Sequence, residues 1–221
     1  MAKTSPYQSV LLRLTHGFAA LSAIAAWFTG FWVYDNYDRR WGTIGLPKLI
    51  EIQNIHGTIA VAFTMIFALF ALYSLRLGYR RLIQPDALSS LQQLNQPRWW
   101  QTLHQATNTL MLAASVIAMI TGRMMEEKWL PGGELDHRWY LAHLLAWVFL
   151  FLALASHVLM AVKIGGMPLI LSMVNGKIRS GDNIQAWWQQ LQTKRSRFFL
   201  RLEIIIIGGI AVALILPVFK P

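Results

Sequence analysis

The residues in this chain most suited to chemistry are its histidines. There are six of them, at positions His16, His56, His104, His137, His143 and His157. Five lie within or at the edge of long apolar stretches, where an ionisable side chain is costly to bury and is therefore a candidate functional residue. An imidazole can bind a metal ion or transfer protons. A lone histidine could equally hydrogen-bond to a neighbouring helix, so the spacing has to decide.

His143 and His157 share one apolar stretch and are fourteen residues apart. In a helix, two side chains fourteen residues apart point in directions that differ by about 40°, and they lie about 21 Å apart along the axis. Both imidazoles therefore face one interior, at opposite depths. On other apolar stretches, His16 lies at the depth of His157 and His56 at the depth of His143. The spacing predicts two depth-matched pairs.

The two pairs favour haem over other metals. Zinc and copper need ligands that converge at one point, and two pairs at opposite depths cannot converge. A haem iron needs only two axial ligands, because the porphyrin supplies four nitrogens. The chain has no cysteine, which excludes disulfides, cysteine-ligated iron–sulfur clusters and covalent haem attachment. Small residues flank the four histidines, as a planar ligand requires, although they also favour close helix packing.

Composition indicates an integral membrane protein. Of 221 residues, 55% are hydrophobic and only 14% are charged, whereas soluble domains carry about 25% charged residues. The net charge of +10 could indicate nucleic-acid binding. Its distribution in the loops is instead typical of membrane orientation. We therefore expect the lipid bilayer, and no nucleic acid, as a partner. The N-terminus lacks the cleavage site of a removed signal peptide.

Hydrophobic runs of about 20 residues are the length of a bilayer-crossing helix. Five such runs are present, at about 10–33, 52–75, 103–124, 139–162 and 198–219. Tryptophan and tyrosine mark many of their ends, as in membrane interfaces. The predicted fold is all-α: an integral membrane four-helix haem-binding bundle over residues 1–175, followed by residues 176–221. This second part would hold an inner-side amphipathic segment, "SGDNIQAWWQQLQTKRSRFF", and a fifth transmembrane helix.

Basic residues predict the orientation, because cytoplasmic loops carry more of them. With the N-terminus inside, thirteen lie inside: Lys3, Arg13, Arg76, Arg80, Arg81, Arg98, Lys163, Lys177, Arg179, Lys194, Arg195, Arg197 and Arg201. Seven lie outside: Arg39, Arg40, Lys48, Arg123, Lys128, Arg138 and Lys220. We therefore expect the N-terminus inside and the C-terminus outside a bacterial-type energy-transducing membrane.

Several segments resemble the bacterial di-haem cytochrome b family of the cytochrome b(561) and nickel-hydrogenase b-subunit type. They are "YQSVLLRLTHGFAALSAIAAWFTGFWV", "NIHGTIAVAFTMIFALFALYSLRL", "LHQATNTLMLAASVIAMITGRM" and "AHLLAWVFLFLALASHVLMAVKIGG". The likeness covers about residues 7–175. The connection between the first and second helices, "YDNYDRRWGTIGLPKLIEIQN", is long, and the shortest family members have no fifth helix. Either feature could create or cover a docking surface.

The resemblance implies two non-covalent haem b groups, with His16 and His157 as axial ligands of the inner haem and His56 and His143 of the outer haem. His104 could serve a haem propionate or a quinone, and a plain interfacial histidine is as good an interpretation. Arg13 and Arg76 could pair with propionates or only with lipid headgroups. No catalytic residue is assigned.

Three functions are consistent with these features. The first is an electron-transfer cytochrome that exchanges electrons with a quinone or quinol pool, and some relatives oxidise superoxide. The second is a haem-bearing membrane-anchor subunit of a larger oxidoreductase, of the hydrogenase or formate dehydrogenase type, with a redox partner subunit. The third is a structural bundle whose histidines only hydrogen-bond.

Overall fold

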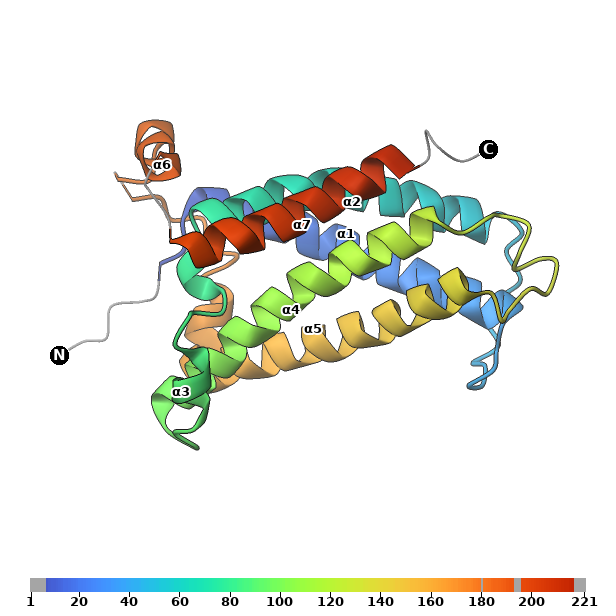
Figure 1. Ribbon diagram of the computed structural model, residues 1–221, viewed down its shortest axis with the longest axis horizontal. Helices are drawn as coiled ribbons and strands as arrows, with labels where there is room; N and C mark the ends of the chain where they lie inside the picture. Colours follow the sequence, from blue (N-terminus) through green and yellow to red (C-terminus); the bar gives the residue numbers. More distant parts are fainter. Residues whose placement is uncertain (1–6, 180, 193–195, 217–221) are drawn as a thin grey trace.

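The structure is a computed structural model that describes residues 7–179, 181–192 and 196–216. This part of the chain is helical and contains no strand. Five long helices run along the molecule (Figure 1): α1 (Val10–Tyr37), α2 (Ile52–Arg76), α4 (Pro97–Arg123), α5 (Arg138–Leu171) and α7 (Arg197–Ile215). All five are long and apolar enough to cross a membrane, which confirms the predicted all-α membrane fold. Three short helices lie between them: η1 (Tyr79–Arg81), α3 (Ala87–Leu91) and α6 (Ile184–Leu191).

The helix limits differ from the predicted spans at several ends. α4 begins at Pro97 rather than near residue 103, because proline is well suited to the first turn of a helix. α5 is broken at Gly166, whose φ of 61° is not helical, and Pro168 lies just after the break. Helical residues resume beyond the break and reach Leu171, past the predicted end of the span near residue 162. α7 ends at Ile215, and the predicted end at residue 219 lies outside the described residues.

Two helix pairs form the frame of the bundle. α1 packs along α2 and α4 packs along α5, and α7 lies across α2 and α4 (Figure 1). α7 approaches α4 closely at Gly209, where an added Cβ would lie 2.3 Å from Cγ1 of Val116. One apolar core joins the three helices: Phe63, Phe67, Ala71, Leu75, Leu112, Val116, Met119, Phe199, Ile206, Ile210 and Ala213. The fifth helix is thus built into the bundle.

A buried ion pair also attaches α7. Arg76, in the last turn of α2, pairs with Glu203 of α7, which is 9% exposed. A charge in an apolar environment needs such a partner, because an unpaired one would carry a large desolvation penalty. The pair therefore fixes the position of α7 along α2.

At one end of the bundle, called the distal end, lie the 38–51 and 124–137 connections. Asp35 is fully buried there and accepts hydrogen bonds from Thr43 Oγ1 and from the backbone N–H groups of Ile44 and Leu46, each at 2.8 Å. Three donors on one carboxylate satisfy its charge without water. This residue folds the long connection back over the end of α1.

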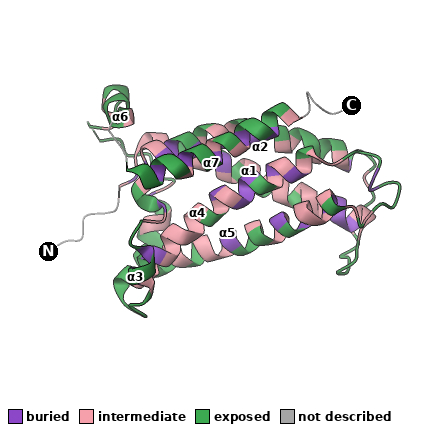
Figure 2. Ribbon diagram, viewed as in Figure 1, coloured by how far each residue is buried: buried purple, intermediate pink, exposed green. Residues whose placement is uncertain are grey.

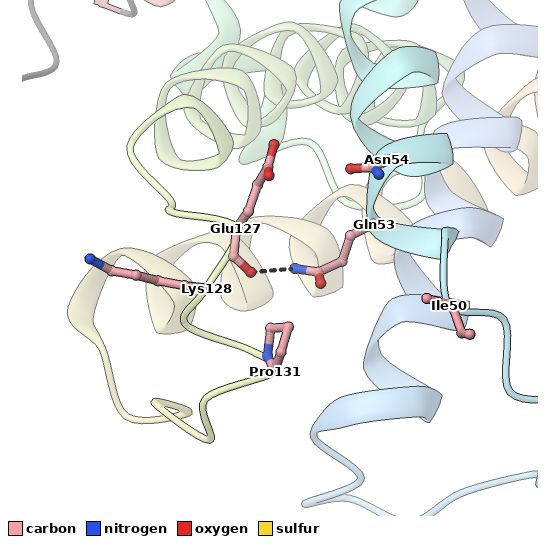
Figure 3. Close-up of a pocket in the computed structure, with 6 residues that line it drawn as sticks. All are labelled: Ile50, Gln53, Asn54, Glu127, Lys128 and Pro131. Atoms are coloured by element: carbon pink, nitrogen blue, oxygen red, sulfur yellow. Dashed lines mark hydrogen bonds between the residues drawn. The ribbon is translucent and has the colours of Figure 1, made fainter.

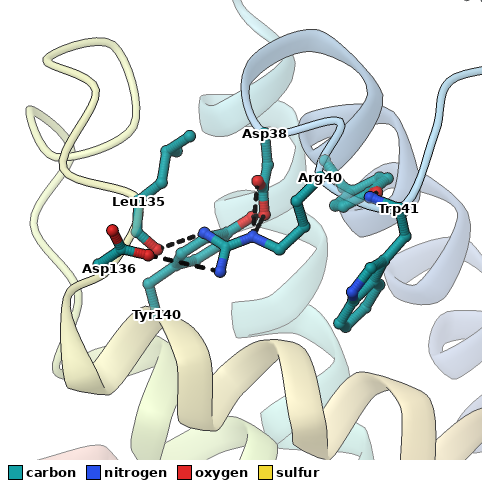
Figure 4. Close-up of polar contacts among 7 residues, drawn as sticks. Asp38, Arg40, Trp41, Leu135, Asp136 and Tyr140 are labelled. Carbon is teal, nitrogen blue, oxygen red and sulfur yellow. Dashed lines mark hydrogen bonds and ion pairs between the residues drawn. The ribbon is translucent and has the colours of Figure 1, made fainter.

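A second polar cluster joins the two connections (Figure 4). Arg40 Nε donates to both carboxylate oxygens of Asp38 at 2.8 Å, and its Nη2 donates to the carbonyl of Leu135 at 2.6 Å. Tyr140 of α5 donates its hydroxyl proton to Asp38 at 2.7 Å. The hydrogen bond to Asp38 and its charge raise the pKa of the Arg40 guanidinium. The cluster links α1 to α5 at the distal end.

The opposite end, called the N-terminal end, is where α1 begins. There Asp182 accepts hydrogen bonds from the Tyr7 hydroxyl (2.6 Å), the Val10 N–H (2.6 Å) and Trp187 Nε1 (2.7 Å). Burial alone would raise the pKa of Asp182, but these hydrogen bonds outweigh it and hold that pKa below its ordinary value. Of the amphipathic segment predicted over residues 180–199, only Ile184–Leu191 form α6, with Trp188 largely exposed. Residues 180 and 193–195 lie outside the described residues, and 197–199 already belong to α7.

The long helices expose apolar side chains over much of their outer surface (Figure 2). On α1 alone, Leu14, Phe18, Leu21 and Phe28 are each more than half exposed. Soluble monomers rarely show such continuous apolar faces. These surfaces suit contact with lipid acyl chains.

Candidate functional site

The structure brings together the two histidine pairs predicted from depth. The ring centroids of His16 on α1 and His157 on α5 are 6.1 Å apart, with an interplanar angle of 35°. Those of His56 on α2 and His143 on α5 are 6.2 Å apart, at 67°. Each histidine pair therefore connects a helix of the α1–α2 pair to α5 of the α4–α5 pair.

These separations equal the span of two imidazoles that bind one metal from opposite sides. A first-row metal lies about 2 Å from an imidazole nitrogen, and the ring centre about 1 Å further, so the two centres should be about 6 Å apart. The ring centroids of His104 and His157 are only 5.1 Å apart, which is too close for two imidazoles on opposite sides of one metal. Among the described residues, no group of three or more His, Cys, Asp or Glu side chains could hold an ion. The donor set therefore fits a metal that brings its own equatorial ligands.

The His143 imidazole is held with its Nε2 free. Its Nδ1 lies 3.0 Å from the carbonyl of Ala118 and 3.1 Å from Thr121 Oγ1, both on α4. A carbonyl can only accept, and the Thr121 hydroxyl already donates to Ile117 O at 2.7 Å. The proton must therefore be on Nδ1 of His143, which leaves the Nε2 lone pair for a metal.

His56 stands in the same relation to α1. Its Nδ1 lies 3.0 Å from Thr29 Oγ1, whose own proton goes to Ala25 O at 2.9 Å. The carbonyl of Ala26 also acts as a backbone hydrogen-bond partner of His56. The same reasoning places the His56 proton on Nδ1.

A glycine next to each threonine makes room for the imidazole. An added Cβ at Gly30 would lie 3.1 Å from Cε1 of His56, and one at Gly122 would lie 3.1 Å from Cε1 of His143. At Gly17 and Gly57, which follow His residues in the sequence, an added Cβ would meet nothing within 4 Å. The glycines that fit against the distal imidazoles thus come from neighbouring helices and not from the histidines' own sequence neighbours.

Sequence reasoning missed this arrangement, although a signal was present. The first and third spans carry the matching pentapeptides "AWFTG" (26–30) and "AMITG" (118–122). In each, the alanine carbonyl and the threonine hydroxyl lie on one helix face, three residues apart. We call each of these pentapeptides an imidazole cradle.

The pair at the N-terminal end is held differently. Asn108 Oδ1 on α4 lies 2.7 Å from Nδ1 of His157. His16 packs edge-on against Phe70 of α2, with ring centroids 5.6 Å apart. Within the described part of the chain, the His16 ring makes no hydrogen bond. Asn108 was also missed as a candidate from the sequence.

Stacked aromatic rings join α1 to α5 between the two pairs. Trp27 and Trp147 are parallel, with ring centroids 5.0 Å apart and an angle of 7°. Phe151 stacks on Trp27 at 5.1 Å, and Trp147 Nε1 donates to the Trp27 carbonyl at 3.2 Å. The stack therefore connects the α1–α2 pair to the α4–α5 pair at a depth between the two histidine pairs.

The remaining predicted residues take other positions. His104 lies beside His157, and its Nε2 is buried without a partner in the described structure. Arg13 donates to the Lys177 carbonyl at 2.8 Å, and Arg76 is in the ion pair with α7. Roles for these three residues toward a cofactor stay predictions.

A polar pocket opens at the distal end, between the start of α2 and the 124–137 connection (Figure 3). Its volume is about 360 Å³, and its lining includes Gln53, Asn54, Glu127 and Lys128. Gln53 Nε2 donates to the Glu127 carbonyl at 3.3 Å across it. The pocket lies within one turn of His56, but no imidazole lines it.

Comparison with known families assigns the chain. The model of the family described as prokaryotic cytochrome b561 matches residues 7–176, which is most of the sequence. The chain belongs to the prokaryotic cytochrome b561 family. Neither the curated proteins nor the solved structures gave a match to it. A cytochrome b561 is a membrane b-type cytochrome, so the family implies haem b and haem-based electron transfer. The free Nε2 atoms and pair separations described above fit that cofactor.

Proposed function

We propose that this cytochrome b561 binds two haem b groups, one between His16 and His157 and one between His56 and His143, and exchanges electrons with membrane quinone. The observation that carries the proposal is the near-equal separation of the two ring pairs, 6.1 and 6.2 Å. When bound, each haem supplies one reversible electron at its iron. Two axial imidazoles leave no open iron position, so the iron itself does not activate oxygen.

The chain's residues hold and insulate these groups. The imidazole cradles fix the protons of His56 and His143 on Nδ1, and the Trp27–Trp147 stack places apolar rings between α1 and α5. The five apolar helices keep both sites within the membrane thickness. Fixed ligand orientation and burial are the means by which a protein sets haem potential.

Quinone is favoured over a small anion such as superoxide by the balance of charge at the distal end. In and next to the 38–51 and 124–137 connections, six basic residues are balanced by seven acidic ones, and Arg40 and Lys128 are paired with Asp38 and Glu126. Balanced charge gives little field for steering an anion. An apolar carrier can instead reach the bundle through the lipid-facing surfaces. With the thirteen-to-seven bias of basic residues, the N-terminal end faces the inside.

The position of α7 bears on the anchor-subunit alternative. One side of α7 shares its core with α2 and α4 and is tied by Glu203. The other side exposes apolar residues such as Ile204 and Ile205, which suit lipid as well as a partner helix. The electron-transfer function of the isolated chain is the proposal to test first.

The test uses the purified protein in liposomes and a short-chain quinol. Oxidation of one quinol releases two electrons and two protons, so one quinol should reduce the two haems of one chain. The expected result is that quinol reduces both haems fully, giving the same haem absorption spectrum as reduction by dithionite. Reduction by dithionite alone, with no response to quinol or to oxidised quinone, would overturn the quinone part of the proposal.

A further inference from the structure

Asn108 contacts the candidate site without being a ligand. Its Oδ1 lies 2.7 Å from Nδ1 of His157, while its Nδ2 donates to the carbonyl of Arg81 at 2.8 Å. The first contact joins α4 to α5, and the second joins α4 to the connector that follows α2. One amide therefore links three parts of the fold at the N-terminal end.

The connector fixes which way this amide faces. Two further bonds hold it against α4: Gln105 Nε2 donates to Arg80 O at 2.9 Å, and Ile83 N donates to Thr109 Oγ1 at 2.9 Å. Because a carbonyl accepts only, the Asn108 NH₂ must face Arg81 and its oxygen must face His157. The acceptor is thus set by the backbone and not by the imidazole.

We propose that Asn108 is the positioning residue of His157, keeping its proton on Nδ1 and its Nε2 toward the iron, and thereby lowering the reduction potential of that haem. The inference rests on the proposed function, in that His157 must be an axial ligand. Asn108 acts through His157 and is not itself a ligand or a catalytic residue.

The direction of the effect follows from basicity. An acceptor on the Nδ1 proton draws that proton away and raises the electron density on Nε2. A more basic axial ligand stabilises the ferric iron relative to the ferrous iron, so the potential falls. His16, the other imidazole of the pair, has no hydrogen bond among the described residues, so Asn108 is the main such influence on this site.

The effect should be confined to one haem. His56 and His143 take their acceptors from the imidazole cradles at the distal end, which Asn108 does not touch. Asn108 and the Thr121 cradle lie on the same helix, α4, thirteen residues apart, or about 20 Å along its axis. A change at Asn108 should therefore leave the second haem as a reference inside the same molecule.

The experiment is a potentiometric titration of the full-length holoprotein with haem content measured per chain. Asn108→Leu removes the acceptor, and Asn108→Asp replaces the amide with a stronger one at pH 8. The matched control is Gln105→Leu, which removes a neighbouring hydrogen bond to the same connector but has no contact with His157. A His157→Ala variant, measured for haem content, identifies the haem that depends on His157.

In Asn108→Leu we expect one midpoint potential to rise, so that the reduced-to-oxidised ratio at a fixed potential changes about tenfold, or about 59 mV. Asn108→Asp should shift the same midpoint the other way, and Gln105→Leu should shift neither. Loss of only that haem in Asn108→Leu also supports the proposal, because loosened outer contacts weaken metal binding about 10–100-fold.

Equal behaviour of Asn108→Leu and Gln105→Leu would overturn the inference, as would a rise in Asn108→Asp as large as that in Asn108→Leu. Failure of the proposed function is seen separately. It would show as an unchanged haem content in His157→Ala, whatever the Asn108 variants do.

Discussion

Thr121 on α4 accepts a hydrogen bond from Nδ1 of His143 on α5 at 3.1 Å, while its own proton is donated within its helix. Thr29 on α1 has the same relation to His56 on α2 at 3.0 Å. The α1–α2 pair and the α4–α5 pair thus hold a histidine by the same local arrangement. This arrangement fixes the orientation of the two distal imidazoles, as their proposed role as haem ligands requires.

The two cradle glycines should be needed for haem at the distal site. In Gly30→Ala or Gly122→Ala the new Cβ lies 3.1 Å from an imidazole carbon, so the ring must move away from its position. We expect each variant to lose distal haem affinity by about 10–100-fold. Haem content per chain, measured by absorption against protein concentration, checks this expectation.

Gly208→Ala in α7 is the matched control, since an added Cβ meets nothing within 4 Å there and α7 carries none of the four histidines. Alanine in a helix is favoured over glycine by about 0.5–1 kcal/mol, so this control should bind haem normally and be slightly more stable. Equal haem loss in the control and the cradle variants would show that the cradles have no special role.

The ion pair between Arg76 and Glu203 should stabilise the attachment of α7. Removing one partner of a buried pair costs about 3–5 kcal/mol. Because about a third of the Arg76 side chain is exposed, we expect Glu203→Gln to lose about 1–3 kcal/mol. Denaturant unfolding in detergent measures the loss.

The double variant Arg76→Met with Glu203→Met tests whether the loss comes from an unpaired charge. Replacing both partners by apolar side chains of similar size should recover most of the stability. If the double variant is as unstable as Glu203→Gln, α7 depends on some other contact of these side chains.

The hydrogen bonds on Asp182 predict a pH dependence at the N-terminal end. The pKa of this carboxyl is lowered in the folded protein, so its stabilising effect is present above the ordinary aspartate pKa of 3.8. The effect is lost as the pH falls below that value, through the folded pKa. The protection factors of the backbone amides in residues 181–191, which correct for the intrinsic pH dependence of exchange, should therefore be constant from pH 8 to about 5 and fall only in stronger acid.

Asp182→Asn should raise the exchange of this segment at pH 7, because the charged acceptor of the Tyr7, Val10 and Trp187 donors is gone. Rapid exchange in the unchanged protein at pH 7, or a transition near pH 6, would contradict this account of the segment.

Much of the fold followed from the sequence, and the reason is hydropathy. Five apolar runs fixed five spans, and the depth of each histidine in its run was enough to pair His16 with His157 and His56 with His143. These inferences need only the position of a residue along a helix axis. Ends set by local chemistry were less accurate, as at Pro97 and Gly166.

Contacts that depend on helix rotation could not be predicted. Asn108 and Thr121 contact imidazoles only because α4 presents one particular face to α5. The rotation of α4 about its own axis cannot be predicted from a sequence pattern. The attachment of α7 was missed for the same reason: Glu203 reads as a flanking charge until Arg76 is found opposite it. Repetition of Ala-x-x-Thr-Gly was visible but has no meaning before its histidines are placed.

The central claim is that four histidines bind two haems in two couples. Its most direct measurement is the number of haems per chain in the unchanged protein and in His16→Ala, His157→Ala, His56→Ala and His143→Ala, with His104→Ala and His137→Ala as controls. The account predicts two haems in the unchanged protein and in both controls. Each of the four ligand variants should retain one, and both members of a couple should lose the same spectral component. A single haem in the unchanged protein, or variants of one couple that lose different components, would contradict it.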